Sequence, residues 1–256
     1  MVAASGRTHD VPMLLVDRRW GRGERTALLL HGLFSDSGCW HRLGPALARR
    51  GYTVFAPDLR GHGLSESGAY SPELWADDVA ETYRDQRIDL MVGHSLGGTV
   101  AALTAPTLRP ATAVYLDPAW RTTDAQNRAF ARQWSAWLDW ADIEDLRREL
   151  GSRWPEQDLR LRWESMQRVD PRVVPGLAAG RGYDYSPRQA LVRSLVLGAD
   201  HSDYITEQHA RELAGRGLTV ETVAGSGHSW FREDFPAFLA RLDSWLAHAD
   251  TADPAR

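Results

Sequence analysis

Short apolar runs alternate with helical segments along most of the chain. Several of the runs are apolar at every position, which is typical of parallel strands covered on both faces. Segments with a single apolar stripe, typical of helices, separate the runs. The alternation predicts an open α/β sheet with helices on both sides. The predicted strands cover 13–16, 26–30, 52–56, 88–92, 113–116, 194–197 and 218–223.

Local signals mark the ends of several predicted helices. A helix over 40–50 is expected to end at Gly51, a residue that caps helices well. A helix over 72–84 is expected to begin after Ser71, whose hydroxyl can accept from a free N–H. The apolar stripe over 235–246 predicts a terminal helix.

The alternation is interrupted once, between 119 and 189, where no strand is predicted. Helical segments are expected instead, over 123–141, 142–150 and 155–167. Such an insertion is interpreted as a helical cap over the carboxyl edge of the sheet. The predicted organisation is a core over 1–118 and 190–256 and a cap over 119–189, in one continuous fold. Tryptophans are frequent in the cap, and one or two are expected to line an apolar pocket: Trp120, Trp134, Trp137, Trp140, Trp154 and Trp163.

Composition mainly excludes certain partners and types of chemistry. The chain has 256 residues, of which 43% are hydrophobic and 25% charged, as in ordinary globular proteins. A net charge of −4 suggests neither a nucleic-acid nor a membrane partner. All 30 basic residues are arginines, so no lysine can act as a base or form a Schiff base. Cys39 is the single cysteine, which excludes an intrachain disulfide and a cysteine-based metal site.

Targeting signals are not found. Residues 1–10 lack the apolar core of a signal peptide, and no run reaches the roughly 20 apolar residues of a membrane span. A cytoplasmic protein is therefore expected, acting on a small-molecule substrate as a monomer or homodimer. We expect no cofactor and no metal.

The sequence Gly93-His94-Ser95-Leu96-Gly97 stands between a predicted strand and a small-residue helical stretch. A strand that turns abruptly into a helix forces the middle residue into a strained conformation, which small neighbours two positions away permit. The turn presents the Ser95 hydroxyl beside a helix N-terminus, where negative charge is stabilised. Ser95 is therefore the predicted nucleophile.

A serine hydroxyl needs a base that removes its proton and an acid that orients that base. His228 follows the strand predicted over 218–223 in a glycine-flanked loop, so it is the predicted base. Asp203 is the preferred acid because a helix follows it at the separation expected of a helix-entry loop. Asp200, in the same loop, and Asp117, after the preceding strand, are the alternatives.

An oxyanion needs N–H donors aimed at it. Leu96 follows the nucleophile and is one predicted donor, and Leu33, after the strand predicted over 26–30, is the second, with Phe34 in reserve. The loop over 58–65 is expected to brace the site without taking part in chemistry. The tentative substrate pocket comprises Phe34, His94, Trp120, Trp134 and Trp137.

The predicted nucleophile, acid and base follow one another along the chain in the order Ser, Asp, His. This order and five motifs carry a family resemblance: HGLF, DLRGHGLS, GHSLGG, SD and GSGH. Together they resemble the α/β-hydrolase superfamily over roughly residues 12 to 248, and most closely its capped esterases, lactonases, C–C hydrolases and cofactor-free haloperoxidase-like members. The resemblance implies a mostly parallel, doubly wound sheet with a helical cap inserted between the sixth and seventh core strands. Two departures stand out: the acid loop is about one residue longer than usual, and the N-terminal strand region is short.

The predicted function is that of a serine hydrolase. A Ser-His-Asp triad and a covalent acyl-enzyme would act on a small, largely apolar or aromatic ester, lactone or thioester. Lyase, acyltransferase or C–C hydrolase chemistry is the alternative, and a non-catalytic receptor a remote one. A serine at the elbow disfavours epoxide hydrolase and haloalkane dehalogenase chemistry, which the resemblance associates with aspartate. The sequence does not name the substrate.

Overall fold

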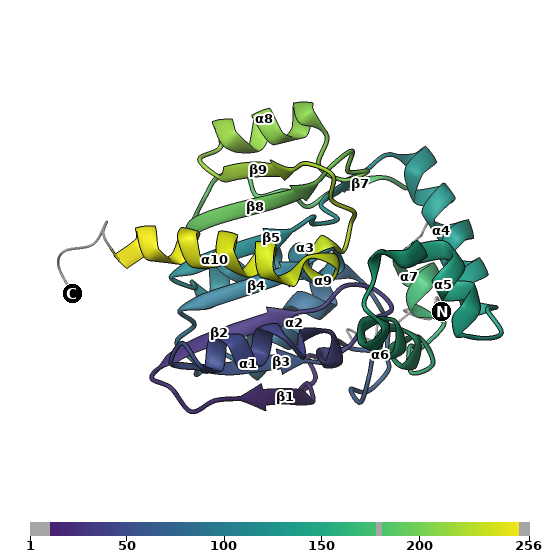
Figure 1. Ribbon diagram of the computed structural model, residues 1–256, viewed down its shortest axis with the longest axis horizontal. Helices are drawn as coiled ribbons and strands as arrows, with labels where there is room; N and C mark the ends of the chain where they lie inside the picture. The colour runs from purple at the N-terminus through teal and green to yellow at the C-terminus, as the bar shows by residue number, and fades with distance from the viewer. Residues whose placement is uncertain (1–10, 178–180, 251–256) are drawn as a thin grey trace, which may run out of the picture.

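The computed structural model describes residues 11–177 and 181–250. Its core is a seven-stranded sheet with the strand order β1-β3-β2-β4-β5-β8-β9, in which only β1 is antiparallel to its neighbour (Figure 1). The predicted α/β sheet is confirmed. Its strands are β1 (Asp17–Trp20), β2 (Arg25–Leu30), β3 (Tyr52–Pro57), β4 (Leu90–His94), β5 (Thr112–Leu116), β8 (Arg193–Ala199) and β9 (Thr219–Val223).

Helices cover both faces of the sheet, and alternate strand residues point into two separate apolar clusters. In β2, Leu28 and Leu30 pack with residues of α2, α3 and α8, whereas Leu29 packs with α1 and α10 on the other face. Continuously apolar strands follow from this two-sided covering. The core helices are η1 (Ser37–Trp40), α1 (Leu43–Ala48), α2 (Pro72–Thr82), α3 (Leu96–Leu108), α8 (Glu207–Gly215), α9 (Trp230–Glu233) and α10 (Phe235–Asp250).

Two helix predictions illustrate how local signals act. The helix expected over 72–84 is α2, and the Ser71 hydroxyl accepts from the Leu74 N–H at 3.2 Å. The helix expected over 40–50 is instead divided into η1 and α1. Pro45 lies in the first turn of α1, where its missing N–H is tolerated.

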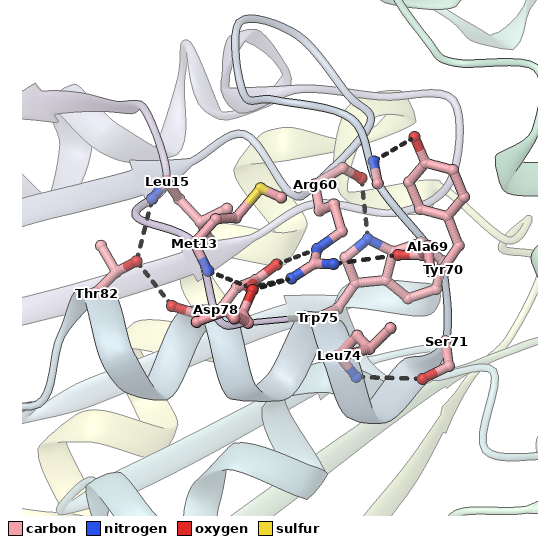
Figure 2. A network of polar contacts seen from close by, with 12 residues as sticks. Met13, Leu15, Arg60, Ala69, Tyr70, Ser71, Leu74, Trp75, Asp78 and Thr82 are labelled. Atoms are coloured by element: carbon pink, nitrogen blue, oxygen red, sulfur yellow. Dashed lines mark hydrogen bonds and ion pairs between the residues drawn. The ribbon is translucent and has the colours of Figure 1, made fainter. Parts of the chain in front are cut away.

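The strand expected over 13–16 is wrong, because the first strand covers Asp17–Trp20 and the N–H groups of Met13 and Leu15 bond to helix α2. The N–H of Met13 donates to Asp78 Oδ1 at 2.8 Å, and that of Leu15 to Thr82 Oγ1 at 3.1 Å (Figure 2). Asp78 also pairs with the fully buried guanidinium of Arg60, at 2.6 Å and 2.8 Å. The loop that carries Arg60 is thus fixed to α2 and to the start of the chain.

Between β5 and β8 lies the helical insertion, grouped beyond the carboxyl ends of the parallel strands (Figure 1). Within the described ranges, β5 is the fifth strand of the main sheet and β8 the sixth. The insertion therefore lies between the fifth and sixth strands, one strand earlier than the expected position between the sixth and seventh. The sheet begins with the single antiparallel strand β1. The insertion also contains an unexpected two-stranded pairing and a fourth α-helix: β6 (Arg121–Thr122), α4 (Asp124–Leu138), α5 (Ile143–Leu150), η2 (Gly151–Arg153), α6 (Glu156–Met166), α7 (Val173–Leu177) and β7 (Tyr183–Asp184).

None of the helices in the described part of the chain has both the length and the apolar character needed to cross a bilayer.

Candidate active site

Ser95 occupies the sharp turn between β4 and α3. Its backbone has φ +52° and ψ −117°, a strained region that a non-glycine residue adopts only when its surroundings enforce it. A Cβ on Gly97 would lie 2.2 Å from the Leu30 carbonyl oxygen, so the helix start can approach β2 only without a side chain there. The predicted small-residue requirement around Ser95 is met in this geometry.

Strand register places the ends of β4, β5 and β8 side by side. His94 is paired with Leu116, and Leu116 with Leu197, so the residues that follow these strands meet at one edge of the sheet. The N–H of Ser95 donates to the Leu116 carbonyl at 3.0 Å, and the N–H of Asp117 donates to the Leu197 carbonyl at 2.9 Å. Ser95 and Asp117 therefore directly follow paired positions at the ends of the neighbouring strands β4 and β5.

The imidazole of His228 is hydrogen-bonded to Asp117. Nδ1 of His228 lies 2.6 Å from Oδ2 of Asp117, whose residue is 1% exposed. A carboxylate can only accept, so Nδ1 carries the proton and Nε2 keeps a lone pair. His228 and Ser95 line the same cavity, with no direct hydrogen bond between them among the described residues. Such bonds are often long in ligand-free enzymes and tighten when substrate binds.

The preferred acid of the sequence analysis, Asp203, is not the partner of His228. Asp203 is exposed at the cavity, and its backbone carbonyl accepts from Gln126 Nε2 at 3.1 Å. Asp200 accepts from the N–H of Gly225 at 2.7 Å. The aspartate that bonds to His228 in the structure is Asp117, the other alternative.

The loop after β8 holds the acid in place. Oδ1 of Asp117 accepts from the hydroxyl of Ser202 at 2.6 Å and from the N–H of Ala199 at 3.1 Å. These bonds occupy the oxygen that does not face His228, which fixes the carboxylate plane. The end of β8 and the loop that follows it therefore each provide one donor to Asp117. Asp117 also has φ +38°, which directs it out of the strand line.

The two predicted oxyanion donors come from different elements next to Ser95. Leu96 is the first residue of α3, and Leu33 belongs to the loop after β2. Among the described residues, neither backbone N–H has a hydrogen-bond acceptor. A Cβ on Gly32 would lie 3.1 Å from the Ser95 Cβ, so this loop passes directly beside the serine. Phe34, with φ +58°, turns its ring toward the cavity.

A cavity of about 390 Å³ lies between the sheet edge and the insertion. Phe34, His94, Trp134 and Trp137 line it, as predicted. Trp120 does not. It is fully buried, and its indole N–H donates to the Gly98 carbonyl at 3.0 Å. Four of the six cap tryptophans line the cavity, more than the one or two expected, because Trp140 and Trp154 do so as well. Tyr204 also lines it and was not predicted.

His94 and Tyr204 pack against His228. Their rings lie 4.8 Å and 5.2 Å from the His228 ring, and Nε2 of His94 is 2.9 Å from the His228 carbonyl oxygen. Burial is the main cause that holds the pKa of His94 well below its usual value. His94 is thus neutral and donates to the loop that carries the base. The position of Tyr204, directly after Asp203, was the only sequence signal that could have revealed it.

Residues 27–242 match the model of the alpha/beta hydrolase family. The chain belongs to this family.

Comparison with curated proteins gives relatives with different named activities. The chain is 31% identical over 245 residues to the dihydrolipoyllysine-residue acetyltransferase component of an acetoin cleaving system from Cupriavidus necator, covering 87% of this chain and 64% of that protein. It is 32% identical over 160 residues to the 2-(acetamidomethylene)succinate hydrolase of Mesorhizobium japonicum, covering 58% of this chain and 57% of that protein. The match to an uncharacterised protein of Mycobacterium tuberculosis spans only 23% of that protein's length.

Among solved structures, an esterase from Exiguobacterium antarcticum superimposes with a TM-score of 0.75 and 17% identity, covering 91% of this chain and 95% of that chain. At this identity, the likeness establishes the shared fold alone.

Proposed function

We propose that this protein is a serine hydrolase in which Ser95 is the nucleophile, His228 the general base and acid, and Asp117 the residue that orients His228. One observation carries the proposal: the 2.6 Å bond from His228 Nδ1 to Asp117, with His228 on the cavity that Ser95 lines. The strained turn at Ser95 supports the same assignment.

The reaction follows from these positions. Nε2 of His228 takes the Ser95 hydroxyl proton while Oγ bonds to the substrate carbonyl carbon, and the carbonyl π electrons move to its oxygen. The N–H groups of Leu96 and Leu33 stabilise that oxyanion, and each such donor is typically worth about 3 kcal/mol. His228 then gives its proton to the leaving group as the acyl-enzyme forms. A water molecule, deprotonated by His228, releases the acid and restores Ser95.

The walls of the cavity support a small substrate with an apolar or aromatic part. Phe34, Trp134, Trp137 and Trp140 supply aromatic surface beside Ser95, and about 390 Å³ accommodates a compact molecule. Short esters, lactones and thioesters fit this description.

Acyl transfer is a second candidate, because one relative with 31% identity over 87% of this chain is named as an acetyltransferase component. It uses the same acyl-enzyme, with an alcohol or thiol in place of water. Adding methanol or a small thiol during turnover measures how the acyl group partitions between water and the acceptor.

A panel of short acyl esters, lactones and thioesters tests the proposal. Ser95→Ala removes the nucleophile, and Ser135→Ala, at an exposed position on α4, is the matched control. We expect turnover of at least one substrate class by the wild type and Ser135→Ala, and none above background by Ser95→Ala. Equal turnover by all three would contradict the proposal.

A further inference from the structure

Two guanidinium groups line one wall of the cavity without an acidic partner. Arg162 comes from α6 of the insertion and Arg232 from α9 of the core. Within residues 11–177 and 181–250, no carboxylate oxygen lies within 4.0 Å of either guanidinium. A buried cation normally has a paired anion, so an unpaired set of two beside a cavity points to a ligand.

Arg232 is the more deeply buried of the two, at 2% exposed. Its Nη2 donates to the Ser35 hydroxyl at 2.9 Å, and its Cζ lies 4.7 Å from the ring centre of Trp154. Nε and Nη1 have no hydrogen-bond partner among the described residues. Its positive charge is therefore only partly compensated, by a hydroxyl and aromatic faces.

Arg162 presents donors to the cavity. Its Nη1 donates to the Leu33 carbonyl at 2.6 Å, and its Cζ lies 5.7 Å from the ring centre of Phe34. The remaining nitrogens have no partner within the described parts of the chain. Burial, and then the charge of Arg232, lowers the pKa of Arg162 to about 9, so it is still a cation at neutral pH.

Neither guanidinium forms an ion pair with the acidic residues that line the cavity, which are Glu149, Asp203 and Glu233. Glu233 lies 3.7 Å from a third cavity arginine, Arg153. Asp36, next in sequence to Ser35, is paired with Arg168 at 2.6 Å. The positive charge is thus local to the wall formed by Arg162 and Arg232.

We propose that this wall is a carboxylate subsite, and that the hydrolase acts on esters or related acyl compounds that carry a second, free carboxylate. Arg162 contacts the carboxylate, and Arg232 supplies positive charge behind it. The inference rests on the proposed function for the reacting end of the substrate. Arg162 also binds the carbonyl of Leu33, a predicted oxyanion residue, so the carboxylate subsite lies close to the oxyanion site. A substrate that fills both has only a short chain between its free carboxylate and its reacting carbonyl.

Guanidinium groups bind carboxylate and phosphate oxygens alike, often through two parallel N–H donors. Low dielectric in a buried pocket strengthens such a bond. A carboxylate at this wall would accept from the unused donors of Arg162, whereas a neutral ester would leave this partly buried guanidinium without a charged acceptor. Discrimination against neutral substrates follows from that difference.

Two matched pairs of esters measure this discrimination: ethyl hydrogen glutarate against diethyl glutarate, and 4-acetoxybenzoate against its methyl ester. They place the charge on the acyl side and on the leaving-group side, respectively. We expect one charged member to be preferred in kcat/KM by about 10- to 100-fold, the range typical of a hydrogen bond to a charged group.

Arg162→Met removes the charge, and Arg160→Met is the matched control. Arg160 lies on the same helix and pairs with Glu156 at the exposed surface. The charged-to-neutral ratio is expected to fall at least tenfold in Arg162→Met, to be partly restored in Arg162→Lys, and to remain unchanged in Arg160→Met. A ratio isolates the charge effect, because loss of the Leu33 contact slows both members of a pair.

A binding measurement keeps this inference separate from the proposed function. Calorimetry with glutarate and with inorganic phosphate, on the wild type, Ser95→Ala and Arg162→Met, requires no turnover. Glutarate binding by the first two and not by Arg162→Met supports the subsite even if no ester is hydrolysed. Three results would overturn the inference: equal hydrolysis of both members of each pair, no binding of glutarate, or tight binding of phosphate alone.

Discussion

Nδ1 of His228 lies 2.6 Å from Oδ2 of Asp117, an aspartate that follows β5 and precedes the whole helical insertion. His228 and Asp117 are thus 111 positions apart in the chain, and Asp117 follows the strand next to the one that precedes Ser95. The last residue of β8 donates its N–H to Asp117, and Ser202 in the loop after β8 donates its hydroxyl.

Replacing Asp117 and Asp203 in turn should show which of them orients His228. Asp117→Asn is expected to lower kcat by roughly 10⁴-fold, because an amide can hold the imidazole in the wrong tautomer and cannot stabilise its charge. Asp203→Asn is the matched control and is expected to stay within a few-fold of the wild type. The measurement is kcat on any ester turned over by the wild type. A silent Asp117→Asn beside an inactive Asp203→Asn would reverse the assignment.

Gly97 is predicted to be essential for the turn at Ser95. A Cβ there would lie 2.2 Å from the Leu30 carbonyl oxygen and 2.5 Å from that of His31, so the start of α3 must move. We expect Gly97→Ala to lower both kcat and thermal stability. Gly215→Ala, at the end of α8 with no atom within 4 Å of the added methyl, should be stabilising by about 0.5–1 kcal/mol. Normal activity in Gly97→Ala would contradict the steric argument.

His62 should make the protein sensitive to acid. Burial, and then the neighbouring His31, lowers the pKa of His62 to about 3, whereas an unfolded histidine titrates near 6.5. Between these values only the unfolded state gains the proton, so the free energy of unfolding falls as pH decreases, by about 1.4 kcal/mol per pH unit for one histidine.

Denaturant unfolding between pH 6 and 4 measures this dependence. His62→Asn should reduce the slope by about one proton, and His201→Asn, whose side chain is 96% exposed, should not change it. An identical slope in the wild type and His62→Asn would show that His62 is not buried in its neutral form.

The Arg60–Asp78 pair is predicted to be structurally essential. Both side chains are fully buried, so Arg60→Met leaves an uncompensated buried carboxylate at a cost of about 3–5 kcal/mol. Arg84→Met, which removes an exposed pair with Glu81, should change the free energy of unfolding by less than about 1 kcal/mol. Urea unfolding compares the two variants. A similar small effect for both would contradict the importance of burial.

Sequence patterns were sufficient to predict the sheet and the turn at Ser95. Continuous apolar runs and small residues determine these features through contacts close in sequence. The same patterns placed a strand over 13–16, since all four of its residues are apolar. Tertiary contacts decided otherwise, as Asp78 and Thr82 on α2 accept the N–H groups of Met13 and Leu15.

The sequence did not predict which aspartate bonds to His228, for a related reason. Asp117 and Asp203 both follow strands that end at the same edge, and neither position alone states which carboxylate reaches His228. That depends on the course of the loop after β8, which turns Ser202 toward the site and leaves Asp203 exposed. Likewise, Trp120 and Trp137 have equal apolar character, but only packing determines that Trp120 faces Tyr115 in the core and Trp137 the cavity.

The most direct test of the triad is covalent labelling of Ser95 by a fluorophosphonate, followed by intact-protein and peptide mass spectrometry. The account predicts one adduct, located on Ser95, that forms quickly in the wild type and Asp203→Asn, orders of magnitude more slowly in His228→Ala and Asp117→Asn, and not at all in Ser95→Ala. Labelling at another residue, or at an unchanged rate in Asp117→Asn, would contradict it.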